Sequence, residues 1–282
     1  MNKKILTILL SALCLGAKAQ DTTSLHNEQE NVAKIFERCY TADNDSAKIS
    51  GLNAATDNLE SMLQDPSAFD YNFYKLENVS SIYSENREIR VLTFGVELQS
   101  GNYLYSGFIV TNNNGNIVIT RLKDDFDKQE NPQKSNMQAN NWFGAIYYEI
   151  HQVGSKKYPV YALCGWDGAD LFINRKVLEQ IIIQEDGTPI FGGNFQRENS
   201  FKNTRIIFEF TEKAAMGLRF ENSVKNMNGE KRRKVIVADH LTTPPEYKGN
   251  PRFSGPDMTF EGYYFQDGKW KYESILDIKL EQ

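Results

Sequence analysis

The chain has 282 residues, of which 40% are hydrophobic and 12% aromatic, and its formal net charge at pH 7 is −5. All-β domains of this length are common, and the hydrophobic fraction is sufficient for a full core. The acidic balance excludes a typical nucleic-acid-binding protein, because phosphate backbones need a basic face. We interpret the one basic run, Lys231-Arg232-Arg233-Lys234, as the solvated shoulder of a hairpin.

Residues 1–19 have the order of a secretory signal peptide. A basic head precedes an apolar run over residues 5–16, and Ala17-Lys18-Ala19 closes it with small residues. This order predicts cleavage between Ala19 and Gln20, and the run is too short for a permanent membrane span. Cleavage removes three lysines and no acidic residue, which leaves a net charge of −8. We therefore expect a periplasmic or otherwise exported protein with no transmembrane segment after cleavage.

Lipid anchoring at Cys14 is the alternative interpretation of this head. A lipoprotein signal places a small residue before the modified cysteine, whereas Leu13 stands there. Cleavage after Ala19 is therefore the favoured prediction.

Residues 20–27 are polar and predict a flexible leader, and residues 28–66 predict a helical prelude. Hydrophobic residues recur at helical spacing over residues 28–40. A second helix follows, capped by Asp45 or Ser46 and ended by Asp65-Pro66. The expected buried side chains of the two helices are Val32, Ile35, Phe36 and Cys39, then Ile49, Leu52, Leu59, Met62 and Leu63.

From residue 73 the hydrophobic pattern alternates, which predicts strands. Residues 73–123 predict a four-stranded antiparallel meander with strands at 79–83, 89–97, 103–110 and 116–122. The polar segment 124–141, with Pro132 in its middle, predicts a linker or an exposed loop and a candidate subdomain boundary.

Residues 142–282 predict a second, larger β region, and residues 73–282 could also form one continuous β domain. Its expected strands are 145–151, 158–165, 177–183, 205–210, 216–221, 235–239, 260–265 and 270–276. No long helix follows residue 70, so a parallel sheet is not expected. The predicted fold is mainly β, with antiparallel meanders after two N-terminal helices. An irregular propeller, a sandwich and an open barrel all remain open.

The mature chain has two cysteines, Cys39 in a predicted helix and Cys164 in a predicted strand. A disulfide needs Cα atoms within about 7 Å, which spacing in the sequence does not reveal. We expect two separate buried thiols.

His240 is the most interesting of three histidines, because Asp239 precedes it and a proline-rich loop over residues 242–257 follows. A histidine acting in catalysis needs a nucleophile or water and a group that orients its ring. Neighbours on a strand point to opposite faces, so Asp239 is a poor orienting group. Gly255-Pro256-Asp257 predicts a turn with Asp257 as a candidate carboxylate at a pocket rim.

The segment Gly165-Trp166-Asp167-Gly168-Ala169-Asp170 combines acids, glycines and a tryptophan. Asp167 and Asp170 are candidate calcium ligands, although a full calcium loop has more oxygen ligands at defined spacing. Trp166 beside these acids would also suit a sugar ring. A tight turn with a packed tryptophan is the simpler interpretation.

Common catalytic signatures are absent from the sequence, including G-x-S-x-G, H-E-x-x-H, the P-loop and C-x-x-C. A pair of carboxylates needs only proximity in space, so a hydrolase of that kind stays open.

Several short motifs occur in one order along the chain. They are Asn141-Trp142-Phe143-Gly144-Ala145, Tyr147-Tyr148, Gly165-Trp166-Asp167-Gly168, Phe191-Gly192, Ile207-Phe208-Glu209, Leu218-Arg219-Phe220, Asp239-His240-Leu241, Gly255-Pro256-Asp257 and Gly268-Lys269-Trp270. In this respect the chain resembles a group of uncharacterised exported proteins of Bacteroidetes, from about Phe73 onward. The first half departs from the group at Tyr83-Ser84-Glu85-Asn86, where Asp-Gly would be expected. The resemblance implies export and no particular activity.

The same resemblance bears on O-glycosylation, which such bacteria place on short Asp-Ser/Thr patterns. Asp45-Ser46-Ala47 and Asp21-Thr22-Thr23 fit the pattern, so Ser46 and Thr22 are candidate acceptors.

The leading hypothesis is a periplasmic binding or assembly module without catalysis, which presents loops to an envelope protein or a glycan. The alternative is a periplasmic hydrolase of a glycan or ester that uses Asp167, Asp170, His240 and Asp257 at one rim. No cofactor is expected beyond the calcium considered above.

Overall fold

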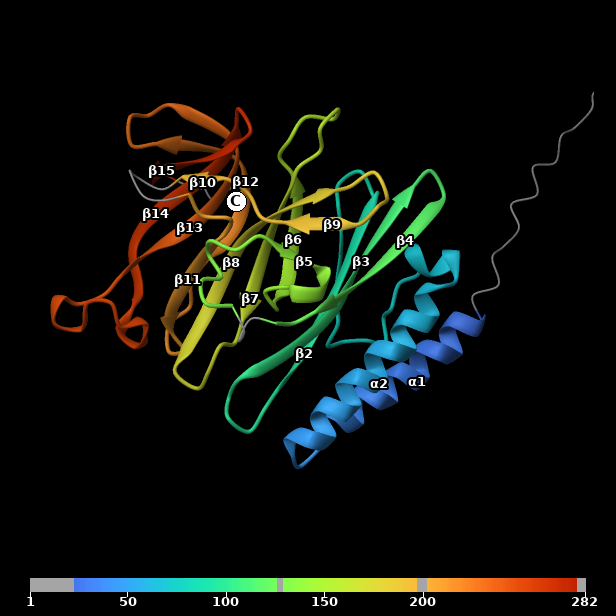
Figure 1. Cartoon of the computed structure of the whole chain (residues 1–282). Helices are drawn as coiled ribbons and strands as arrows, with labels where there is room; N and C mark the ends of the chain where they lie inside the picture. Colours follow the sequence, from blue (N-terminus) through green and yellow to red (C-terminus); the bar gives the residue numbers. More distant parts are fainter. Residues whose placement is uncertain (1–22, 126–128, 197–201, 278–282) are drawn as a thin grey trace, which may run out of the picture.

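The structure, a computed structural model, describes residues 23–125, 129–196 and 202–277. It is mainly β, with two N-terminal helices followed by antiparallel sheets that do not close into a barrel (Figure 1). The predicted signal peptide, with Cys14, Ala19 and Gln20, and the candidate acceptor Thr22 lie outside the described residues.

The helices are α1 (Thr23–Tyr40) and α2 (Asp45–Leu63), and the 3-10 turn η1 (Pro66–Phe69) follows. The predicted leader was too long, because α1 includes residues 23–27 and Leu25 extends its buried stripe. The predicted cap was also wrong, since the Asn44 side chain accepts the amide of Ala47 at 2.9 Å. Asn44 has the extended backbone that an N-cap needs, whereas Asp45 already lies in the helix.

Strands β1 (Ser80–Tyr83), β2 (Ile89–Glu97), β3 (Tyr103–Asn113) and β4 (Asn116–Lys123) form an antiparallel sheet in chain order. This sheet, called the meander below, confirms the prediction for residues 79–122. The β3–β4 turn carries Asn114 at φ +52° and Gly115 at φ +91°. Both conformations belong to the two-residue turns that match strand twist.

Two further sheets follow, the middle sheet and the outer sheet. The middle sheet has the order β5-β9-β8-β7-β6, and β11 also pairs with β8. The outer sheet has the order β10-β15-β12-β13-β14, and β14 also pairs with β15. Their strands are β5 (Met137–Gln138), β6 (Ile146–Gln152), β7 (Tyr161–Asp167), β8 (Ile173–Ile183), β9 (Pro189–Phe191), β10 (Phe195–Gln196), β11 (Ile206–Thr211), β12 (Leu218–Asn226), β13 (Lys231–Thr242), β14 (Gly255–Gln266) and β15 (Lys269–Asp277). Short 3-10 turns are η3 (Ala139–Asn141), η4 (Pro245–Tyr247) and η5 (Pro251–Phe253).

The helices and three sheets stack in layers. Both helices lie side by side on one face of the meander, and the middle sheet lies on its other face (Figure 1). Strand alternation divides the cores: Tyr161 and Leu163 of β7 pack toward the meander, while Ala162 and Cys164 pack toward the outer sheet. Stacked sheets of this kind agree with the sandwich among the architectures left open.

The short elements were not expected from the sequence. Strands β5, β9 and β10 have two or three residues each, too few for a visible alternation. In the described part of segment 124–141, β5 joins the middle sheet by pairing with β9 and Met137 is fully buried, so the segment is not an exposed loop along its whole length. Strand β10 pairs with β15 in parallel, which departs from the otherwise antiparallel ladders.

The two cysteines of the described chain are free and buried in different cores, as expected. Ser46 lies exposed in the first turn of α2. Among the described residues, no helix combines the length and hydropathy that a membrane span requires. Ile49, expected in the core, is instead exposed on α2.

Candidate functional site

Asp167 ends β7, and protein groups already occupy its carboxylate. One oxygen accepts the Tyr105 hydroxyl at 3.1 Å and the amide of Ala169 at 2.9 Å, and the other accepts Nη1 of Arg175 at 3.0 Å. The adjoining cavity has a volume of about 30 Å³, which is room for roughly one water. Asp167 is therefore part of a closed polar cluster.

Asp170 stabilises its own turn. Its Oδ1 accepts the amides of Phe172 at 2.7 Å and Ile173 at 3.0 Å, as Asp commonly does in turns. Trp166 is half-buried, with the Tyr103 ring edge-on at 5.3 Å between centroids. Within the described ranges, no group of three or more His, Cys, Asp and Glu could hold a metal ion. These contacts agree with the tight-turn interpretation and give no support to the calcium or sugar site.

Gly255-Pro256-Asp257, predicted as a turn, instead begins strand β14, and His240 and Asp257 come together across the β13–β14 ladder. Nδ1 of His240 lies 2.8 Å from Oδ2 of Asp257, at a position where the ladder shifts register between Asp239 and Leu241. Such irregularities re-aim side chains, which explains how His240 meets a carboxylate on the neighbouring strand. Asp239 instead accepts the amide of Gly217 at 2.8 Å, as its opposite orientation predicts.

The second oxygen of Asp257 accepts both the amide of Thr259, at 3.0 Å, and its hydroxyl, at 2.6 Å. The Thr259 hydroxyl makes the largest contribution to lowering the pKa of Asp257, and His240 adds to it. In the described chain, His240 has no hydrogen bond or ion pair except that to Asp257. A nucleophilic hydroxyl or thiol is therefore not within hydrogen-bonding reach of this ring.

The four predicted polar residues thus fall into two groups. Asp167 and Asp170 shape one turn, and His240 pairs with Asp257. The turn and the β13–β14 connection are neighbours, since Glu212 donates to the carbonyl of Phe172 while Thr211 donates to that of Ser254. In the second group, Nε2 of His240 has no hydrogen bond within the described chain.

The connection between β13 and β14 presents an exposed aromatic surface that the sequence prediction missed. The rings of Tyr247 and Phe253 stack with centroids 3.9 Å apart at 12°. The guanidinium of Arg252 lies 4.1 Å from the centroid of the Phe172 ring, which joins the connection to the β7–β8 turn. We call Leu171, Phe172, Tyr247, Arg252 and Phe253 the aromatic face.

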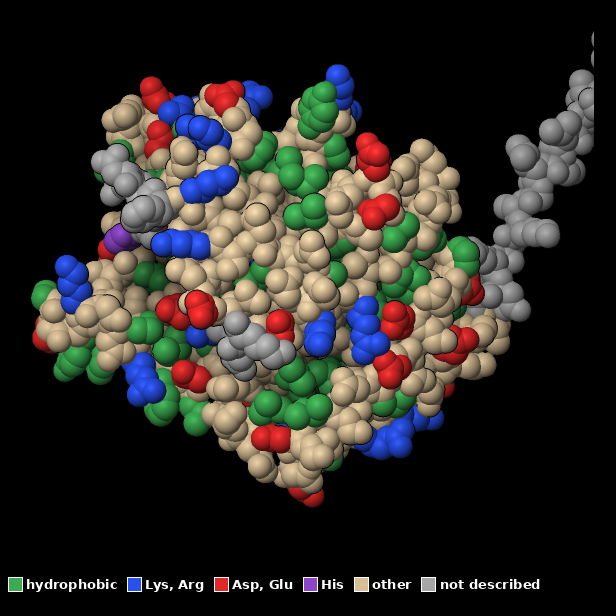
Figure 2. Space-filling view, viewed as in Figure 1, with side chains coloured by type: hydrophobic (Ala, Val, Ile, Leu, Met, Phe, Trp, Pro, Cys, Tyr) green, Lys and Arg blue, Asp and Glu red, His purple; other side chains and the backbone are tan. Residues whose placement is uncertain are grey.

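The aromatic face is solvent-exposed despite its composition. Phe172 is 48%, Tyr247 43% and Phe253 45% exposed. Figure 2 shows hydrophobic side chains gathered over the β13–β14 connection, at the lower left. Nearby in sequence, Met258 is 92% exposed and has φ +70°, an uncommon conformation for a non-glycine residue. Two aromatic residues in an otherwise polar, proline-rich loop were the available sequence signal.

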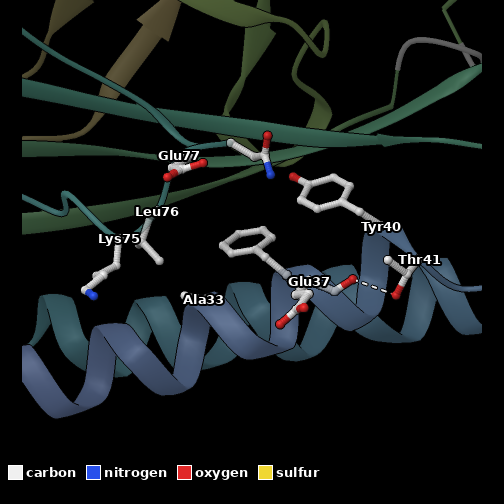
Figure 3. A pocket seen from close by; sticks show the side chains of 9 residues that line it. Ala33, Glu37, Tyr40, Thr41, Lys75, Leu76 and Glu77 are labelled. Atoms are coloured by element: carbon white, nitrogen blue, oxygen red, sulfur yellow. Dashed lines mark hydrogen bonds between the residues drawn. The ribbon is translucent and has the colours of Figure 1, made fainter.

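A separate pocket of about 310 Å³ lies between α1 and the segment before β1 (Figure 3). Glu37 and Tyr40 line it from the helix, and Lys75 and Glu77 line it from the facing segment. The Tyr40 hydroxyl is buried and has no hydrogen-bond partner in the described chain. Burial raises the pKa of this phenol, so it is neutral. An unpaired buried hydroxyl is a cost to stability rather than evidence of a ligand.

Comparisons with protein-family models, curated proteins and solved structures find no match to this chain.

Proposed function

We propose that this chain is an exported binding module without catalysis, and that its aromatic face docks a partner protein of the cell envelope. Export is supported by the signal-peptide pattern of residues 1–19. Docking is supported by one observation, the stacked rings of Tyr247 and Phe253 held half-exposed beside Phe172. Large exposed apolar patches commonly mark interaction sites.

The residue types favour a protein over a glycan as the partner. Aromatic residues and Arg are enriched in the cores of protein interfaces, and Tyr and Arg among binding hot spots. A sugar ring on an aromatic residue stacks on a free face of that ring. Tyr247 and Phe253 each cover one face of the other, and Arg252 covers Phe172.

The experiment is affinity purification from an envelope extract, followed by reconstitution with the purified partner. We expect a partner that binds the mature chain and loses affinity at least about thirtyfold with Phe172→Ala plus Phe253→Ala. This factor corresponds to roughly 2 kcal/mol, the threshold of a binding hot spot.

Tyr158→Ala is the matched control, because Tyr158 is 69% exposed and lies outside the aromatic face. It should leave the affinity unchanged. Equal binding by the double variant would contradict the docking role. A glycan bound through these same residues, with no protein partner, would replace the partner class proposed here.

The His240–Asp257 pair is the one observation that favours the hydrolase alternative. Its geometry leaves Nε2 of His240 to act on water. Turnover of 4-nitrophenyl acetate and 4-nitrophenyl glycosides by the native chain, lost in His240→Ala, would support this alternative. Equal rates in the two proteins would exclude catalysis of these substrates by His240.

A further inference from the structure

A groove of about 220 Å³ lies where the β3–β4 hairpin meets the β8–β9 hairpin. Asn113 and Asn116 line it from the first hairpin, and Gln184 and Glu185 line it from the second. None of the described residues that line it is Lys, Arg or His. Ligand pockets commonly form at junctions between structural units, and this groove lies where two sheets meet.

The first hairpin contains more amides than its turn requires. The turn itself uses Asn114 and Gly115, with the side chain of Asn112 accepting the Gly115 amide at 2.8 Å. Asn113 uses its oxygen to accept from Asn114 at 3.2 Å, so its NH₂ group can still donate. The side-chain amide of Asn116 has no partner in the described chain. Two amides beyond the turn's needs therefore line this wall of the groove.

The facing hairpin contributes acceptors. Gln184 donates through Nε2 to the Thr188 hydroxyl at 2.8 Å, which leaves its carbonyl oxygen available. Glu185 is exposed, and its carboxylate has no partner among the described residues. The β8–β9 wall thus has acceptors. The facing wall has the amide donors and, beside Asn112, the exposed carboxylate of Glu88, which accepts from the Asn86 side chain at 2.6 Å.

The two hairpins are held together, so the groove is preformed. The hydroxyl of Thr111 donates to the carbonyl of Gly187 at 3.0 Å. Gly187 has φ +87°, and a Cβ there would lie 2.7 Å from a methyl carbon of Val118. Only glycine permits this approach, and a preformed site reduces the ordering cost of binding.

We propose that this groove binds one neutral sugar ring of a saccharide. Sugar hydroxyls both donate and accept, so they match amide donors on one wall and acceptors on the other. The C–H face of the ring would pack on Val118, Pro159 and Ile183, which also line the groove. An anion would meet Glu185 without a compensating cation. This site is separate from the aromatic face.

The test is an NMR titration of the isotope-labelled mature chain with methyl glycosides of glucose, galactose, mannose and xylose. At least one should bind with a Kd of about 1–10 mM, the range of a single weak subsite. Its shift changes should be confined to the segments that line the groove, residues 88–89, 111–118, 159–161 and 183–188. No saturable shift with any of the four glycosides, or shifts located elsewhere, would overturn the proposal.

Three variants determine which groups recognise the ligand. Asn113→Ala plus Asn116→Ala should lower the affinity at least about tenfold, the effect of losing two ordinary hydrogen bonds. Asn78→Ala, an exposed asparagine elsewhere, should have no effect.

Glu185→Gln should preserve sugar binding within about threefold. If the groove instead binds ethanolamine and Glu185→Gln abolishes that binding, it is a cation site. The Phe172→Ala plus Phe253→Ala variant should bind sugar normally, so the two proposals can fail independently.

Discussion

The meander and the middle sheet each bury a complete arginine that holds an irregular segment in place. Arg90 of β2 is 1% exposed, and its Nη1 donates to the carbonyl oxygens of Ala68, at 2.7 Å, and Phe69, at 3.0 Å, in η1. Arg205, directly before β11, is 0% exposed and donates to the carbonyls of Pro132 and Ser135. In both regions a guanidinium hydrogen-bonds backbone carbonyls that lie outside the strands.

The two arginines differ in what compensates their charge. Arg90 has no ion-pair partner in the described chain; it lies 4.4 Å from the centroid of the Phe73 ring and 4.9 Å from that of Tyr83. Burial lowers the pKa of Arg90 to about 10, so it stays charged at neutral pH. Arg205 instead donates through Nε to Glu179 at 2.6 Å, and the Tyr147 hydroxyl donates to the other oxygen of that carboxylate.

This difference shows two ways to bury a cation. Neutral carbonyls and ring faces contribute separately, so the loss of one leaves the others intact. A buried ion pair is coupled, because removal of one member leaves a lone charge in a dry interior. The second β region should therefore respond more strongly to single substitutions.

The largest effect should come from Glu179→Ala. It leaves Arg205 charged and buried, so we expect a loss of about 3–5 kcal/mol in the free energy of unfolding by urea. The control is Glu209→Ala. The Glu209 side chain pairs with Arg175 but is 42% exposed, so its removal should lower the free energy of unfolding by less than about 1 kcal/mol. Glu179→Leu with Arg205→Met should recover part of the loss. Equal effects of Glu179→Ala and Glu209→Ala would refute the coupling.

Arg90→Met should cost less, about 2 kcal/mol. Each carbonyl keeps another donor, since the Tyr71 amide bonds Ala68 and the Tyr83 hydroxyl bonds Phe69. Hydrogen exchange should increase in η1 while the outer sheet stays protected. The control Arg87→Met removes a side chain that is 57% exposed and should change stability by less than about 1 kcal/mol. A larger loss of stability for Arg90→Met than for Glu179→Ala would contradict the expected difference between the two buried arginines.

Tyr40→Phe should stabilise the helical layer. It removes a buried hydroxyl that has no partner among the described residues, so the free energy of unfolding should rise by about 1 kcal/mol. Tyr83→Phe should do the opposite, because that hydroxyl donates to the Phe69 carbonyl at 2.6 Å. Destabilisation by Tyr40→Phe would mean that this hydroxyl is satisfied, for example by water.

The smallest effect concerns pH and the partly buried His240–Asp257 pair. The folded pKa of Asp257 lies below its ordinary value of 3.8, so its stabilising contribution is present above about pH 4. It is lost as pH falls through the lower folded pKa. Asp257→Asn should therefore cost less than about 1 kcal/mol near neutral pH, and urea unfolding should show this difference shrinking toward pH 3. A difference that grows on acidification would contradict the lowered pKa of Asp257. Glu185→Gln, which removes an exposed carboxylate with no partner in the described chain, is the control.

The parts of the fold that depend on neighbours in the chain were predictable from the sequence. Alternation and turn residues placed all four strands of the meander and eight longer strands after it. His240, Asp257 and the turn at Asp167 were also recognised as unusual. The aromatic face was missed because loop aromatics have no periodicity that separates an exposed ring from a packed one.

By itself, the sequence determined a mainly β chain behind two amphipathic helices, because period and turn chemistry act over a few residues. Tertiary structure alone decided that β8 pairs with three strands, that β10 runs parallel to β15, and that Arg205 meets Glu179. These contacts join residues far apart in the chain. Their choice depends on how whole layers bury both faces of a sheet, and no local pattern records that.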